Sequence, residues 1–120
     1  MNLSITVRQL EHIVIMELSG RLSVLEANLC QLADQLVERG HRHFIINLAN
    51  VSYLDNSGLG QLCWIYTAAR KDGGEVLLVK PTRRIRSLLN ITKLDTVFEC
   101  FEREGDAIAS MTGLKAAVSA

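Results

Sequence analysis

Hydrophobic positions along the chain follow two periodicities, one typical of strands and the other of helices. Two early segments rich in Val, Ile and Thr flank a polar stretch at residues 9–12, which predicts a pair of strands joined by a turn. Later runs are continuously apolar, as in strands that are buried on both faces. The predicted strands cover residues 4–8, 13–18, 44–48, 75–79 and 96–100.

Apolar residues spaced three or four positions apart predict helices between these strands. After a predicted loop at residues 20–22, Ser23 and Glu26 fit a capping box, and Gly40 fits the C-cap of the same helix. A turn is predicted at residues 90–95. The predicted helices cover residues 24–39, 59–70, 83–89 and 103–111.

The order strand, helix, strand over residues 44–79 predicts a parallel pair of strands joined by a crossover helix. We therefore predict an α/β fold, in which a single mixed sheet of about four or five strands is packed with about four helices. Residues 1–113 are expected to form one domain, because a chain of 120 residues is too short for two. Residues 114–120 are expected to form a flexible C-terminal tail.

Charge and composition argue against several classes of function. The 13 Lys and Arg residues balance the 13 Asp and Glu residues, so there is no electrostatic footprint for nucleic acid. No run of about 18 apolar residues predicts a membrane span, and the first residues lack a signal-peptide pattern, so a cytoplasmic protein is expected. Cys30, Cys63 and Cys100 are far apart and are expected to be reduced and mostly buried. No metal or cofactor site is predicted.

The most informative segment is Asp55-Asn56-Ser57-Gly58-Leu59-Gly60, between an apolar strand and an amphipathic helix. Ser57 is predicted to lie in a loop at the amino end of that helix, where the first amides favour a phosphate. Gly58 and Gly60 would let the backbone approach a partner closely. The structural alternative is that Ser57 simply caps the helix, and the local pattern leaves both interpretations open.

An enzymatic role for Ser57 is not supported by the sequence. The segment lacks the first glycine of the G-x-S-x-G nucleophile elbow, and the glycines do not fit a phosphate-binding loop. His41 and His43 precede the strand that leads to Ser57, so they are predicted at the opposite end of the sheet, and His12 falls in another turn. We therefore do not expect an enzyme.

Two surface features flank this segment. Arg83, Arg84 and Arg86 form a basic patch on the third predicted helix, which begins at the same edge of the sheet as Ser57. The patch is either a solvated face or a surface for a partner. Trp64, on the helix that follows Ser57, is predicted to be partly exposed or to pack on a flank.

The chain resembles the STAS domain, and within it the anti-sigma factor antagonists, over about residues 4–112. The most specific part is residues 47–60, where an apolar strand leads into Asp-x-Ser-Gly-x-Gly. The turn at residues 20–22 and Pro81 after the central strand agree in order and spacing. Residues 88–98 look like the family segment Leu-x-x-Thr-Gly-Leu-Asp-x-Val/Ile-Phe.

The resemblance implies a binding module switched by phosphorylation. Unphosphorylated, such a protein binds an anti-sigma factor that is also a serine kinase, and so frees a sigma factor. The kinase phosphorylates the motif serine, here Ser57, which breaks the complex, and a PP2C-type phosphatase reverses the reaction. The residues implied in partner binding are Asp55, Asn56, Ser57, Gly58, Leu59, Gly60, Arg21 and Ser23.

Three positions depart from the family pattern. Asn56 stands where the family often has Ser, Ser23 stands where it often has Asp, and Lys93 replaces the Gly of the Thr-Gly-Leu segment. An alternative function stays open: a non-switching STAS subunit of a stress-signalling scaffold or of a lipid transporter complex.

Overall fold

A computed structural model of the protein describes residues 3–23 and 28–112. Its strands form one mixed sheet in the order β1-β2-β3-β4-β5, in which β1 is antiparallel to β2 and all other neighbours are parallel. This confirms the predicted α/β fold with a single mixed sheet. The strands are β1 (Leu3–Leu10), β2 (Ile13–Leu22), β3 (His43–Leu54), β4 (Glu75–Val79) and β5 (Glu99–Phe101).

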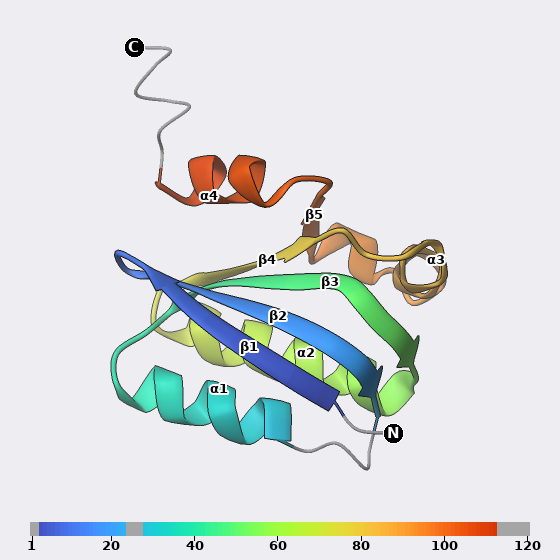
Figure 1. Ribbon diagram of the computed structural model, residues 1–120, viewed down its shortest axis with the longest axis horizontal. Helices are drawn as coiled ribbons and strands as arrows, with labels where there is room; N and C mark the ends of the chain where they lie inside the picture. The colour runs from blue at the N-terminus through green and yellow to red at the C-terminus, as the bar shows by residue number, and fades with distance from the viewer. Residues whose placement is uncertain (1–2, 24–27, 113–120) are drawn as a thin grey trace.

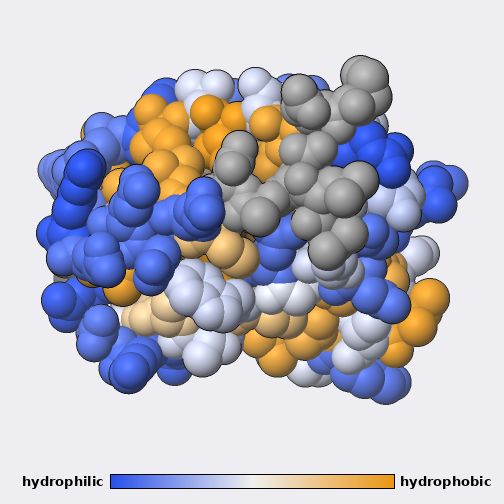
Figure 2. Space-filling model, turned by 90° about the horizontal axis from the view of Figure 1, so that it is seen from below, coloured by the Kyte–Doolittle hydropathy of each residue, from blue (hydrophilic) through white to orange (hydrophobic). Residues whose placement is uncertain are grey.

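Helices cover both faces of the sheet (Figure 1). Two of them lie side by side under one face, and the last helix lies on the other. The outer surface of the first pair carries hydrophobic patches between hydrophilic side chains (Figure 2). The helices are α1 (Asn28–Glu38), α2 (Asn56–Lys71), α3 (Arg83–Ile91) and α4 (Glu104–Thr112), with a short 3-10 helix η1 (Leu94–Thr96) after α3.

The core lies in two layers, because successive side chains of a strand point to opposite faces of the sheet. Phe44 and Ile46 of β3 are fully buried in the larger layer, beneath α1, α2 and α3. Ile45, between them, belongs to the smaller layer, which is closed by Ala107 of α4. The continuous apolar run of β3 is therefore explained by burial on both faces.

Several predicted strand boundaries were wrong. Residues 20–22, predicted as a loop, belong to β2, because Arg21 and Leu22 pair with Tyr53 and Leu54 of a much longer β3. The turn between β1 and β2 consists only of residues 11 and 12. The last strand lies at residues 99–101 rather than 96–100, because η1 occupies residues 94–96.

The helix predictions agree more closely with the structure than the strand predictions do. Gly40 follows α1 with φ of +97°, a left-handed conformation that suits glycine at a helix end. The predicted turn at residues 90–95 begins too early, since α3 continues to Ile91. Glu26 of the predicted capping box, and the predicted tail at residues 114–120, lie outside the described residues. In the described part of the chain, no helix is both long enough and apolar enough to cross a membrane.

Candidate functional site

Asp55, between β3 and α2, is the N-cap of α2. Its backbone is extended, with φ of −112° and ψ of −174°, and its Oδ1 accepts a hydrogen bond from the Gly58 amide at 2.9 Å. The Leu59 amide donates to the Asp55 carbonyl, also at 2.9 Å, as the first helical hydrogen bond. Two predictions were therefore wrong: α2 begins at Asn56, and Ser57 lies within its first turn rather than in a loop.

The Ser57 hydroxyl is not needed to cap the helix. The side chain is half-buried, and among the described residues nothing hydrogen bonds with it. Asp55 meets the capping requirement instead. The first turn of a helix carries partial positive charge and accepts an added anion, so the position suits a phosphate on this hydroxyl.

The two glycines of the motif have different structural roles. A Cβ on Gly58 would collide with the carbonyl oxygen of Leu22, at the end of β2, so this glycine lets α2 pack closely on the sheet. A Cβ on Gly60 would meet nothing within 4 Å, and Gly60 is exposed. Of these two glycines, Gly58 is required by packing, whereas no contact among the described residues requires glycine at position 60.

The end of β2 brings Arg21 and Ser23 close to this motif. The Arg21 guanidinium carbon lies 4.0 Å from the centroid of the Tyr53 ring, a cation–π contact between paired strands. Ser23 is buried, with 6% of its surface exposed, and its backbone carbonyl accepts a hydrogen bond from Gln61 Nε2 at 2.9 Å. Ser23 thus braces α2 and offers little side-chain surface to a partner.

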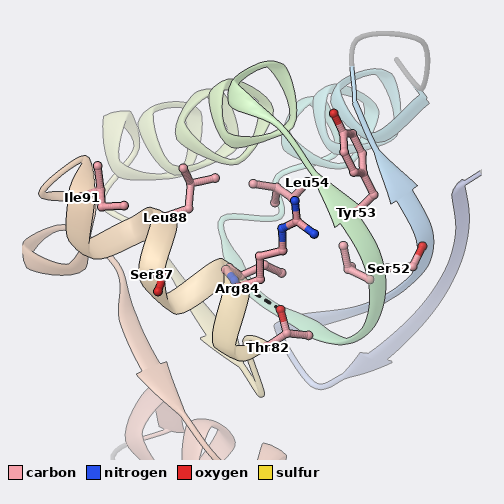
Figure 3. A pocket seen from close by; sticks show the side chains of 10 residues that line it. Ser52, Tyr53, Leu54, Thr82, Arg84, Ser87, Leu88 and Ile91 are labelled. Carbon is pink, nitrogen blue, oxygen red and sulfur yellow. Dashed lines mark hydrogen bonds between the residues drawn. The ribbon is translucent and has the colours of Figure 1, made fainter.

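A groove of about 510 Å³ lies between the end of β3 and α3 (Figure 3). Thr82 caps α3, its hydroxyl accepting from the Ile85 amide at 3.3 Å. The arginines of α3 were predicted from the sequence but the groove was not, because its two walls are far apart in the chain and no local pattern joins them. The groove is lined by Val51, Ser52, Tyr53, Leu54, Thr82, Arg84, Ile85, Ser87, Leu88 and Ile91.

His41 and His43 lie at the opposite end of the sheet from Ser57, as predicted, and His12 lies in the predicted turn between β1 and β2. His43 begins β3, whereas Asp55 follows its end. The His12 and His43 rings meet edge to face with centroids 5.1 Å apart. Burial lowers the pKa of His43, and repulsion from His12 lowers it further. These groups are therefore too remote to activate Ser57.

The three cysteines are half-buried rather than mostly buried as predicted. Burial raises the pKa of each thiol, so Cys30, Cys63 and Cys100 are weak nucleophiles. Trp64 on α2 is 43% exposed, consistent with the predicted partial exposure. In the described ranges, no three side chains of the metal-binding types come together.

Comparison with known proteins places this geometry in a family. The STAS domain model matches residues 4–107. The anti-sigma F factor antagonist of Paenibacillus polymyxa is 25% identical over 113 residues, which cover 92% of this chain and 97% of that protein. The anti-sigma-B factor antagonist of Bacillus subtilis is 29% identical over 101 residues, which cover 82% of this chain and 91% of that protein.

Solved structures share the fold. An anti-sigma factor antagonist from Mycobacterium paratuberculosis superposes with a TM-score of 0.82 at 21% identity, covering 92% of this chain and 95% of that one. The phosphorylated form of SpoIIAA from Bacillus gives 0.74 at 18% identity, covering 89% and 98%. A sulfate transporter family protein from Wolinella succinogenes gives 0.76 at 20% identity, covering 91% and 92%.

Proposed function

The chain belongs to the STAS domain family, and from this premise we propose that it is an anti-sigma factor antagonist controlled by phosphorylation of Ser57. Without phosphate it binds an anti-sigma factor that is also a serine kinase, and so releases a sigma factor. Phosphorylation breaks the complex, and a PP2C-type phosphatase restores binding. The protein acts in the cytoplasm as a binding partner rather than as an enzyme.

The observation that carries this proposal is the division of roles between Asp55 and Ser57. Because the Asp55 carboxylate caps α2, the Ser57 hydroxyl can be modified without removing a capping bond. A phosphoryl group adds about −1.5 to −2 charges at pH 7, which the first turn of a helix tolerates. The added charge therefore acts on the partner surface and leaves the fold intact.

The proposed partner surface consists of the motif and the adjoining end of β2. Asn56 and Gly60 are exposed and can meet a partner directly. Gly58 and Leu59 are buried and hold the first turn of α2 against the sheet. Arg21, whose guanidinium stacks on the Tyr53 ring, extends this surface onto β2. The Ser23 carbonyl supports the surface by accepting a hydrogen bond from Gln61 of α2.

Intact mass spectrometry tests the acceptor. The purified protein is incubated with ATP and the anti-sigma serine kinase from the same genome. We expect the wild-type chain to gain one phosphate and Ser57→Ala to gain none, because Ser57 is the serine of the Asp-x-Ser-Gly motif and its hydroxyl has no hydrogen-bond partner among the described residues. Equal incorporation in both chains would reject Ser57 as the acceptor.

Isothermal titration calorimetry tests the switch. Ser57→Ala is expected to keep the affinity of the unphosphorylated protein for the kinase. Ser57→Asp is expected to weaken it by about tenfold or more, because a fixed negative charge faces the partner in the complex. Circular dichroism checks that both variants are folded. Equal affinities of Ser57→Ala and Ser57→Asp for the kinase would reject the proposed switch.

The alternative function is that of a non-switching STAS subunit in a signalling scaffold or a lipid transporter complex. The shared fold with a sulfate transporter family protein is the observation that keeps it open. Such a subunit would stay bound to its assembly whether or not Ser57 is changed. Stable co-purification of Ser57→Asp with the same partners as the wild type would therefore favour this alternative.

A further inference from the structure

Strand β3 extends well beyond the end of its neighbour β4. The two strands pair from His43 to Asn47 of β3, and β4 ends at Val79. Farther along, Val51, Tyr53 and Leu54 of β3 pair with β2 on one side only, and Ser52 lies at a bulge in this pairing. In the described part of the chain, no backbone group pairs with the other side of this segment. Residues 51–54 therefore present a short open sheet edge.

Helix α3 faces this open edge across the groove of about 510 Å³ (Figure 3). Leu54 on one wall and Leu88 and Ile91 on the other supply apolar surface. Ile91 is 76% exposed, an unusual degree for a large aliphatic side chain. An open edge is a template for strand addition, and a neighbouring apolar wall selects the side chains of an added strand.

The groove also carries a positive charge, which no acidic side chain of the described residues pairs with. Arg84 is the one charged residue in its lining, and its side chain extends across the groove toward Leu54 (Figure 3). Arg86 pairs with Glu102, whereas Arg83 and Arg84 have no acidic partner among the described residues. Arginines in the first turn of a helix oppose its dipole, so an acidic ligand would relieve this repulsion.

We propose that the groove is a docking site for an extended acidic segment of the anti-sigma kinase. The segment adds a short strand to residues 51–54, places a carboxylate on Arg84 and rests an apolar side chain on Leu88 and Ile91. The inference rests on the proposed function. It deepens that function, because residues 51–54 lead directly to Asp55 and Ser57, so docking would hold the acceptor serine before the kinase.

A matched pair of charge reversals tests the electrostatic part. Arg84→Glu is expected to weaken kinase binding by about tenfold and to lower kcat/KM for phosphorylation of Ser57 to a similar degree. Arg83→Glu, its neighbour outside the groove lining, is expected to change both by no more than about twofold. Negative charge in the first turn of a helix is favoured by the helix dipole, so both Arg84→Glu and Arg83→Glu should fold.

Hydrogen–deuterium exchange tests the strand addition. Kinase binding is expected to slow exchange at the amides within residues 51–54 that face away from β2. The same measurement with ATP alone serves as a control. Protection by ATP without the kinase would make the groove a nucleotide site and would overturn the docking proposal.

The outcomes separate this inference from the function on which it rests. Phosphorylation of Ser57 with equal binding by Arg84→Glu and Arg83→Glu, or without protection at residues 51–54, rejects the groove and leaves the switch intact. A wild-type chain that neither binds the kinase nor gains phosphate rejects both. A selective loss in Arg84→Glu together with protection supports the docking site.

Discussion

Single residues in the Ser57 motif divide the structural and chemical roles between them. Asp55 caps the helix through the Gly58 amide, and Ser57 keeps a hydroxyl without a hydrogen-bond partner among the described residues. Gly58 permits the close contact with Leu22, and Gly60 leaves the exposed face of α2 without a side chain. Substitutions can therefore separate what the fold requires from what a partner requires.

The two glycines provide a matched test of this division. Gly58→Ala is expected to lower the free energy of unfolding by about 1–3 kcal/mol, because its Cβ overlaps the Leu22 carbonyl. Gly60→Ala is expected to raise it by about 0.5–1 kcal/mol, because alanine is the better helix former at an uncrowded position. Urea denaturation measures both. Equal stabilities would contradict the close contact at Gly58.

At the scale of elements, the turn after α3 has a lysine, Lys93, in a backbone conformation that favours glycine. Lys93 follows the helix in the left-handed region, with φ of +66°, and its amide donates to the Asn90 carbonyl at 3.1 Å. This is the position where the family pattern has glycine, which adopts that conformation without steric cost. The lysine is therefore held in a conformation that is unfavourable for a residue with a Cβ.

Lys93→Gly is expected to raise the free energy of unfolding by about 1 kcal/mol, because it relieves the left-handed conformation at the helix end. Lys93→Ala serves as the control, since it removes the same charge and keeps the Cβ. Thermal and urea denaturation should show a gain only for glycine. A similar gain from alanine would assign the effect to charge rather than to backbone strain.

At the scale of the whole molecule, the sheet separates two polar regions. Ser57, the proposed phosphate acceptor, and the groove lie at the carboxyl end of β3, and the paired rings of His12 and His43 lie at its amino end. Arg8 of β1 bridges to Glu104 of α4 at 2.7 Å and to Glu17 of β2 at 2.9 Å, which ties the last helix to the edge of the sheet. The amino end of β3 is thus independent of the proposed switch.

Acidification is expected to destabilise the protein through His43. Burial lowers its folded-state pKa, repulsion from His12 and Arg42 adds to this, and Glu75 opposes it. The unfolded chain therefore takes up the proton first, so stability is full above the unfolded value of 6.5 and falls as the pH drops below it. Urea denaturation between pH 8 and pH 5 measures the slope.

His43→Gln should flatten this pH dependence, and His41→Gln serves as the control, because it replaces a histidine outside the His12–His43 ring contact. An unchanged slope in His43→Gln would show that other groups cause the acid sensitivity. Phosphorylation of Ser57 should be the same in both variants, because both histidines lie at the far end of the sheet.

The sequence by itself determined the features that depend on neighbouring residues. The continuous apolar run at residues 44–48, the helical spacing of residues 59–70 and the glycine at position 40 correctly predicted a buried strand, a helix and a helix end. The Asp-x-Ser-Gly motif also singled out Ser57 before any geometry was known. Local periodicity and turn chemistry are written in consecutive residues, so one sequence suffices to read them.

Only the tertiary structure decided the features that depend on residues distant in the chain. Pairing between β2 and β3 extended both strands to Leu22 and Leu54, and the Leu22 carbonyl gave Gly58 its packing role. The groove beside Arg84 exists because β3 continues after β4 has ended. Hydrogen-bond partners and steric contacts across the sheet leave no local pattern, because they are fixed only when the strands and helices pack together.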